Sequence, residues 1–126
     1  MIVGIGVDLV DMNRIEKAVL SLGQKFLDRV FTQEEQDFCQ KRAQSIESFS
    51  KMFAAKEAVL KAIGQVEGVH WRHIQIKHHS SGKPYVELTE VALQNFQNLL
   101  KGQPGHIHLS ITDEPPYAQA FVIISI

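Results

Sequence analysis

The stretch of residues 2–10, Ile-Val-Gly-Ile-Gly-Val-Asp-Leu-Val, decides how the rest of the chain must pack. Its residues alternate as in a strand, with the apolar side chains on one side, at Val3, Ile5, Val7 and Leu9. The other side carries Gly4, Gly6 and Asp8. Glycine weakens a strand and often marks a place where another backbone or a ligand comes close. Two interpretations stay open: a helix packed closely on the strand, or a ligand site beside Asp8.

The next segment predicts a helix that begins near Arg14, because Asp11 and Asn13 can cap it. We expect its buried stripe to hold Ile15, Val19, Leu22 and Phe26. The opposite side is polar and carries Arg14, Lys17, Ser21, Gln24 and Lys25. Taken alone, a mixed polar face of this kind is ordinary solvated surface.

Two further helices follow in the first half of the chain. Thr32 followed by Glu35 matches a capping box, which predicts a helix from Gln33 to about Arg42. A longer helix is predicted from about Ile46 to Ile63, starting near Ser45 and ending at Gly64. Its expected core contacts are Phe49, Phe53, Leu60 and Ile63. Small residues on this helix allow a neighbour to approach closely, at Ala54, Ala55, Ala58 and Ala62.

After Gly68 the pattern changes to short strands. Ile74 and Ile76 alternate, residues 81–84 (Ser-Gly-Lys-Pro) form a turn, and residues 85–88 return, which predicts a hairpin. Thr89 can then cap a helix through Leu100. A second hairpin is predicted from two alternating stretches, 107–111 and 117–124, around the turn 113–116. This grouping of helices and hairpins favours an α+β fold over a doubly wound α/β sheet.

The composition limits the classes of protein that the chain can represent. At 126 residues and 44% hydrophobic, it is expected to form one core and a single domain, 1–126. Thirteen basic and fourteen acidic side chains give a formal net charge of -1, so the sequence predicts no nucleic-acid partner and no membrane partner. Cys39 is the only cysteine, and neither a signal peptide nor a membrane-spanning apolar run is evident. We therefore expect a soluble, cytoplasmic protein.

A possible phosphate site combines the first strand with the long helix. Glu57 and Lys61 lie four residues apart and share one helix face, and Asp8 joins them if that helix packs over the strand. Two carboxylates with open positions suit Mg²⁺, which keeps waters and accepts substrate phosphate oxygens. Lys61 would neutralise charge on the same phosphate. An ordinary Glu–Lys pair within the helix is the open alternative.

Two sequence blocks resemble the signature blocks of phosphopantetheinyl transferases of the holo-acyl-carrier-protein synthase type. The first is Gly-Ile-Gly-Val-Asp at residues 4–8, followed by Arg14. The second is Phe-Ala-Ala-Lys-Glu-Ala at residues 53–58, followed by Lys61 and Gly64. The likeness continues in the family's order through residues 82–84, 108–111 and 117–120, and so spans nearly the whole chain.

The resemblance implies one small phosphopantetheinyl transferase domain, with an antiparallel-rich sheet packed with helices. It also implies transfer of the 4'-phosphopantetheine of coenzyme A to a serine of apo acyl carrier protein, for fatty acid synthesis. Magnesium would be the cofactor, with Asp8 and Glu57 as its ligands and Lys61 as the third catalytic residue. The family further implies a homotrimer with active sites between neighbouring subunits.

The resemblance also implies two contact surfaces. For coenzyme A, the expected contacts are Lys61, Lys41, Arg42, Gly82, Lys83, Pro84 and Ser110. Acyl carrier proteins are strongly acidic, so a local basic face would bind them. Its expected members are Arg14, Lys17, Lys25 and Arg29.

The chain departs from the family pattern at three places, in ways that concern coenzyme A affinity. Met52 stands where a basic residue is common, and Lys51 beside it is a possible replacement. Gly64, Gln65 and Val66 stand where Gly-Thr-Gly commonly follows the long helix. Asp113 stands where many members carry histidine. Asp8, Glu57 and Lys61 are all retained.

Three other functions are alternatives to this one. A magnesium-dependent nuclease would use similar residues, but it predicts a basic groove and leaves the glycine-rich strand unexplained. A non-catalytic oligomeric binding module would not need all three polar residues. A zinc site could use His106 and His108 or the pair His78–His79, but no Cys/His spacing of a structural zinc motif is present.

Overall fold

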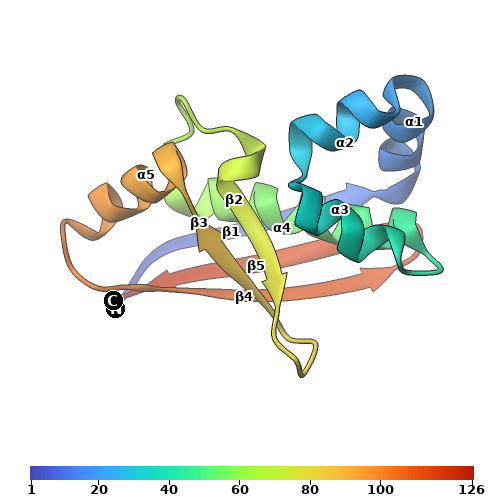
Figure 1. Cartoon of the computed structure of the whole chain (residues 1–126). Coiled ribbons are helices and arrows are strands. Elements are labelled where there is room, and N and C mark those ends of the chain that lie inside the picture. The colour runs from blue at the N-terminus through green and yellow to red at the C-terminus, as the bar shows by residue number, and fades with distance from the viewer.

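The computed structural model describes residues 1–126 and contains two antiparallel sheets with helices packed around them (Figure 1). The predicted α+β class is therefore confirmed. The elements in chain order are β1 (Ile2–Asp11), α1 (Met12–Leu22), α2 (Gln24–Val30), α3 (Gln33–Gln40), α4 (Ser45–Ile63), the 3-10 helix η1 (Trp71–His73), β2 (Ile74–His78), β3 (Pro84–Leu88), α5 (Glu90–Leu100), β4 (His106–Glu114) and β5 (Tyr117–Ser125).

The larger sheet has the strand order β1-β5-β4, so β1 and β4 are its edges. Its register aligns Asp8 with Ala120 of β5, and Ala120 with Ile111 of β4. Residues in one such row point to the same face of an antiparallel sheet. The smaller sheet is the separate hairpin of β2 and β3, with Ile76 opposite Val86. Both predicted hairpins are present.

Helix α4 packs directly against β1 at the two glycines of that strand. A methyl group added at Gly6 would overlap the carbonyl oxygen of Ala58, and one added at Gly4 would overlap that of Ala62. Only glycine permits this approach of strand and helix backbones. The close-packing interpretation of the glycines is therefore correct, and the same contact places Asp8 on the helix side of the strand.

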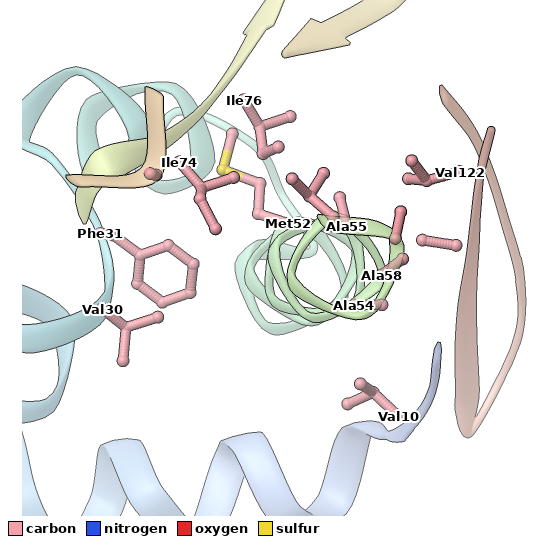
Figure 2. Packing of buried hydrophobic residues seen from close by; sticks show 14 of the residues in the cluster. Val10, Val30, Phe31, Met52, Ala54, Ala55, Ala58, Ile74, Ile76 and Val122 are labelled. Carbon is pink, nitrogen blue, oxygen red and sulfur yellow. The ribbon is translucent and has the colours of Figure 1, made fainter. Parts of the chain in front are cut away.

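The core surrounds α4 on more than one side. Figure 2 looks along this helix and shows Val122 of β5 on one side, with Phe31 and Ile74 on the other. Ala54, Ala55 and Ala58 of α4 are fully buried, as are Val122 and Ile74. Because most of its residues are buried, α4 holds the sheet, the hairpin and the N-terminal helices in one core. No helix of the chain has the length and apolar character needed to cross a membrane.

The prediction of one continuous helix after β1 is wrong, because the structure has two helices there. Gly23 has φ 57° and divides the segment into α1 and α2, and the N–H of Gly23 bonds Val19 O at 2.8 Å. A positive φ suits glycine and ends the regular helix. As a result Leu22 is 55% exposed instead of packing in the core. Ile15 is buried as predicted.

The later helix boundaries follow their local signals closely. The capping box of Thr32 and Glu35 starts α3, which ends at Gln40, two residues before the predicted end. Helix α4 ends at Ile63, and its C-cap Gly64 is left-handed with φ 79°. Thr89 is the N-cap of α5, but its side chain makes no capping hydrogen bond. The short helix η1 had no sequence signal that we recognised.

The contact between β1 and α4 yields a stability prediction. Replacing Gly6 by Ala should lower the free energy of unfolding by about 3 kcal/mol or more, because two backbones must separate. Gly64→Ala is the matched control: no atom would meet the new methyl group, so only the positive φ costs stability, about 1 kcal/mol. Urea denaturation measures both. Equal losses for the two variants would contradict the backbone contact.

Candidate active site

Asp8 and Lys61 meet beside the free edge of β1. Lys61 Nζ lies 3.1 Å from Asp8 Oδ1 and donates a 2.9 Å hydrogen bond to Val7 O. Since β1 is an edge strand, its outer carbonyl groups have no strand partner, and Lys61 satisfies one of them. Just over half of the Lys61 side chain remains exposed, so its ammonium group can also reach a ligand.

Glu57 completes the cluster one helical turn before Lys61. Burial raises the pKa of Glu57, and the nearby charge of Asp8 acts in the same direction. Lys61 and Arg14 of α1 lower that pKa, so both cations also lie near the carboxyl group. The structure therefore brings together the three residues that the sequence grouped, Asp8, Glu57 and Lys61, and adds Arg14 to them.

The chemistry of this cluster fits a divalent cation. Two carboxylates face one half-exposed ammonium group, and hard oxygen ligands of this kind suit Mg²⁺. No three His, Cys, Asp or Glu side chains gather as a ready-made metal site. A cation bound by Asp8 and Glu57 would thus keep most of its positions for water and substrate oxygens, as Mg²⁺ does at phosphates.

The histidines considered for zinc have other neighbours. The rings of His106 and His108 are 6.3 Å apart, and His108 Nε2 lies 2.8 Å from Ser125 Oγ. His78 stacks on Phe38, with ring centroids 4.0 Å apart. His79 stacks on Tyr85.

A cavity of about 220 Å³ lies on the other flank of α4. Its lining includes three residues that the resemblance assigned to coenzyme A: Arg42, Gly82 and Pro84. The other lining residues are Phe38, Ser48, Lys51, Met52, His78 and Ile111. The cavity therefore joins the end of α3, the first half of α4 and the hairpin turn.

The cavity combines stacked rings with positive charge. The guanidinium carbon of Arg42 lies 4.2 Å from the centroid of the Phe38 ring, on which His78 also stacks. Burial lowers the pKa of His78, and the charges of Arg42 and Lys51 lower it further. These effects favour the neutral imidazole, while Arg42 and Lys51 supply positive charge.

Two departures from the family pattern meet at this cavity. Met52 is 3% exposed, and its thioether sulfur lies 3.6 Å from the buried Cys39 Sγ. Lys51 Nζ lies 3.8 Å from Asp113 Oδ1 of β4. Lys51 therefore places a positive charge in the cavity beside Met52, and Asp113 is its acidic neighbour.

The remaining predicted contacts are more dispersed. Lys41 lies in a shallow depression beside Arg42, and Lys83 is exposed in the hairpin turn. Ser110 lies on the exposed sheet face, opposite to its neighbour Ile111. The predicted basic face is exposed but divided by the break at Gly23, with Arg14 and Lys17 on α1 and Lys25 and Arg29 on α2.

The cluster and the cavity occupy opposite sides of α4. Glu57 and Ser48 are nine residues apart, about two and a half turns, so their side chains point in opposite directions. Across the sheet, Asp8 lies on one edge strand and Ile111 on the other. Within the chain the carboxylates and the cavity are therefore separated by the body of the helix.

Comparison with known proteins identifies the family. The model of the 4'-phosphopantetheinyl transferase superfamily matches residues 4–122. The chain belongs to this superfamily. A holo-[acyl-carrier-protein] synthase of Brucella ovis is 50% identical over 127 aligned residues, covering 98% of this chain and 95% of the relative. This confirms the predicted transferase class and leaves the nuclease and binding-module alternatives without support.

Solved structures of phosphopantetheinyl transferases share the fold over the whole chain. Holo-[acyl-carrier-protein] synthase of Neisseria meningitidis is 35% identical with a TM-score of 0.87, covering 100% of both chains. The enzyme of Helicobacter pylori, solved in complex with coenzyme A, is 30% identical with a TM-score of 0.78. That match covers 96% of this chain and 99% of the relative.

Sequence reasoning missed several residues of the cavity. Phe38, Ser48 and His78 carry no motif, because their convergence depends on how α3, α4 and the hairpin pack together. An i, i+4 spacing could have paired Phe38 with Arg42 on one helix face. The sequence indicates Lys51 only as a possible replacement for the basic residue that is missing at Met52.

Cys39 lies behind the cavity and yields a chemical prediction. Burial raises the pKa of its thiol to about 12, and the charge of Glu35 acts in the same direction. The thiol therefore stays protonated, and only a thiolate reacts readily as a nucleophile. Iodoacetamide in mildly alkaline buffer should leave the native protein unmodified and label it fully after denaturation, as measured by mass spectrometry. Rapid labelling of the native protein would contradict this assignment.

Proposed function

We propose that Asp8, Glu57 and Lys61 form the catalytic centre that transfers 4'-phosphopantetheine from coenzyme A to a serine of apo acyl carrier protein. The by-product is adenosine 3',5'-bisphosphate, and the holo carrier protein serves fatty acid synthesis. One observation carries the proposal: these three side chains converge at the edge of β1 in a chain of this superfamily. The names of its relatives, and the coenzyme A complex of one of them, support the substrates.

Asp8 and Glu57 would hold Mg²⁺, which matches the two oxygen ligands and the open positions of the cluster. When bound, Mg²⁺ would supply Lewis-acid polarisation of the pyrophosphate. Lys61 fixes the Asp8 carboxylate through their 3.1 Å ion pair. Its exposed ammonium group would also bind a phosphate oxygen and stabilise the charge that develops there.

The carrier-protein serine must lose its proton as its oxygen attacks phosphorus. Asp8 is already paired with Lys61, so the proposed acceptor of this proton is Glu57, through the carboxylate oxygen that would not hold the metal. Arg14 of α1 lies near Glu57, and the exposed side of α1 also carries Lys17. An acidic carrier protein bound along this basic surface, with Lys25 and Arg29 of α2 at its far end, would present its serine beside Glu57.

The cavity beside α3 would bind the nucleotide end of coenzyme A. Arg42 and Lys51 provide cations for phosphate groups, and the stacked rings of Phe38 and His78 form a flat wall suited to a base. The turn at Gly82 and Pro84 closes one side. Lys41, Lys83 and Ser110 would contact the nucleotide only at the rim, because none of them lines the cavity.

A homotrimer would unite the two half-sites. The cavity of one subunit would complete the carboxylate cluster of its neighbour, since the two lie on opposite sides of α4 in each chain. The sheet face turned away from α4 supports association, because it exposes large apolar side chains at Ile5, Val7, Leu9, Tyr117 and Phe121. A contiguous apolar patch of this kind is typical of an interaction surface. The proposed unit is one domain, residues 1–126, acting in the cytoplasm, where coenzyme A is available.

The central test is transfer itself. The protein is incubated with coenzyme A, Mg²⁺ and apo acyl carrier protein, and the carrier should gain the mass of phosphopantetheine. Asp8→Asn and Glu57→Gln should each reduce the rate at least about a hundredfold while leaving the melting temperature nearly unchanged. Glu47→Gln, at the first turn of the same helix, is the control and should retain full activity.

Two results would contradict the assignment. The absence of any mass gain with several carrier proteins would overturn the proposed function. Full activity of Asp8→Asn or Glu57→Gln would overturn the roles of those residues. As an independent readout, Mg²⁺ with coenzyme A should raise the melting temperature of the wild-type protein and not that of Asp8→Asn.

Shared active sites predict complementation between inactive subunits. Asp8→Asn impairs the carboxylate cluster, and a cavity variant, Arg42→Glu with Lys51→Glu, impairs nucleotide binding. In mixed trimers, some sites would combine an intact cluster from one chain with an intact cavity from another. Unfolding and refolding the two variants together should therefore restore part of the activity. Two variants that stay inactive together, although light scattering shows mixed trimers, would contradict a shared site.

A further inference from the structure

Lys56 and Glu35 form an ion pair in the interior of the protein. The Lys56 side chain is 0% exposed and that of Glu35 2%, and Lys56 Nζ lies 2.8 Å from Glu35 Oε1. Lys56 Nζ also donates to Trp71 O at 3.0 Å and to Ile74 O at 2.6 Å. An ammonium group has three N–H donors, so all three are used.

The Glu35 carboxylate is equally well satisfied. Oε1 accepts the backbone N–H of Thr32 at 2.8 Å, which closes the capping box of α3. Oε2 accepts the backbone N–H of Ile76 at 2.8 Å. The pair thus joins α3, α4, η1 and β2 through directional bonds, and no buried side-chain nitrogen or oxygen lacks a partner.

The same elements build the cavity that lies nearby. One helical turn beyond Glu35 is Cys39, and one turn before Lys56 is Met52; these two sulfur atoms are 3.6 Å apart. The ion pair and this sulfur contact are successive cross-connections between α3 and α4. Met52 itself lines the cavity, as does His78, which lies two residues after Ile76 on the same side of β2.

We infer that Glu35 and Lys56 act as a positioning pair that sets the spacing and register of α3, α4 and β2, and thereby the shape of the nucleotide cavity. The nature of that ligand rests on the proposed function. Apolar contacts between helices tolerate small sliding movements, whereas five directed hydrogen bonds to two charged groups specify one arrangement. Neither residue touches the ligand, so neither is catalytic.

This role can be separated from a simple contribution to stability. Removing one partner leaves an unpaired buried charge, which is strongly destabilising, whereas replacing both by neutral residues is often tolerated. The double variant Glu35→Gln with Lys56→Met should therefore be more stable than either single variant. The double variant would lack the hydrogen bonds that determine the shape of the cavity.

The experiment compares the kinetics of that double variant with those of a control variant. In the double variant the KM for coenzyme A should rise at least about fivefold, with kcat and the KM for carrier protein little changed. The control is Glu87→Gln, which removes a 2.8 Å ion pair within the β2–β3 hairpin and leaves the 3.8 Å contact of Lys77 with Glu34 of α3 in place. It should leave all three parameters unchanged. A folded double variant with the wild-type KM for coenzyme A would overturn the positioning role.

A second measurement uses the wild-type protein, in case the double variant does not fold. Binding of coenzyme A should slow hydrogen exchange of the Thr32 and Ile76 amides, which bond to Glu35, more than that of amides in α5. No added protection in the complex would overturn the inference.

Failure of the proposed transfer reaction can be distinguished experimentally from failure of the positioning role. If the wild-type protein binds coenzyme A by calorimetry without transferring phosphopantetheine, the proposed reaction fails. The comparison of coenzyme A affinities between the double variant and the wild type then still decides the positioning role. Wild-type protein that shows neither binding nor transfer would overturn both.

Discussion

The contact on which the rest of the structure depends is that of the β1 backbone with the α4 backbone. Gly4 and Gly6 bring the strand against the carbonyl groups of Ala62 and Ala58, where any side chain would overlap. At that separation, the next residue on the same side of the strand, Asp8, comes within reach of Lys61. A wider spacing would leave the carboxylate in solvent and Lys61 without its bond to Val7 O. The fold and the candidate catalytic centre therefore share one cause.

Helix α4 also explains why the site is divided. It lies inside the core, so the side chains that escape burial do so along two separate flanks. One flank carries Glu57 and Lys61 beside the edge of β1, and the other carries Lys51 beside β4 and the hairpin. A single chain thus presents the two proposed half-sites in different directions, while its apolar sheet face remains uncovered. The proposed association of identical subunits would account for both features at once.

The elements with strong local signals were predictable from the sequence, and those set by packing were not. The capping box at Thr32 and the glycine at residue 64 fixed the start of α3 and the end of α4. The sequence predicts one continuous helix through Gly23, because a polar and apolar periodicity continues across it. In the site, Asp8, Glu57 and Lys61 were predictable from spacing together with the family resemblance. Phe38 and His78 were not, because no spacing within one element links α3 to the hairpin.

Two adjacent residues show how the helix assigns different chemistry to neighbours in the sequence. Lys56 and Glu57 differ by about 100° around α4, which turns one toward the core and the other toward β1 and α1. Lys56 is enclosed and fully bonded, so it cannot bind a ligand or move a proton. Glu57 is only half-buried, and its burial, together with the nearby carboxylate of Asp8, raises its pKa. Lys56 holds the helix in place because all of its hydrogen bonds are made inside the protein. Glu57 remains available for chemistry because its carboxylate still has room for a ligand or a proton.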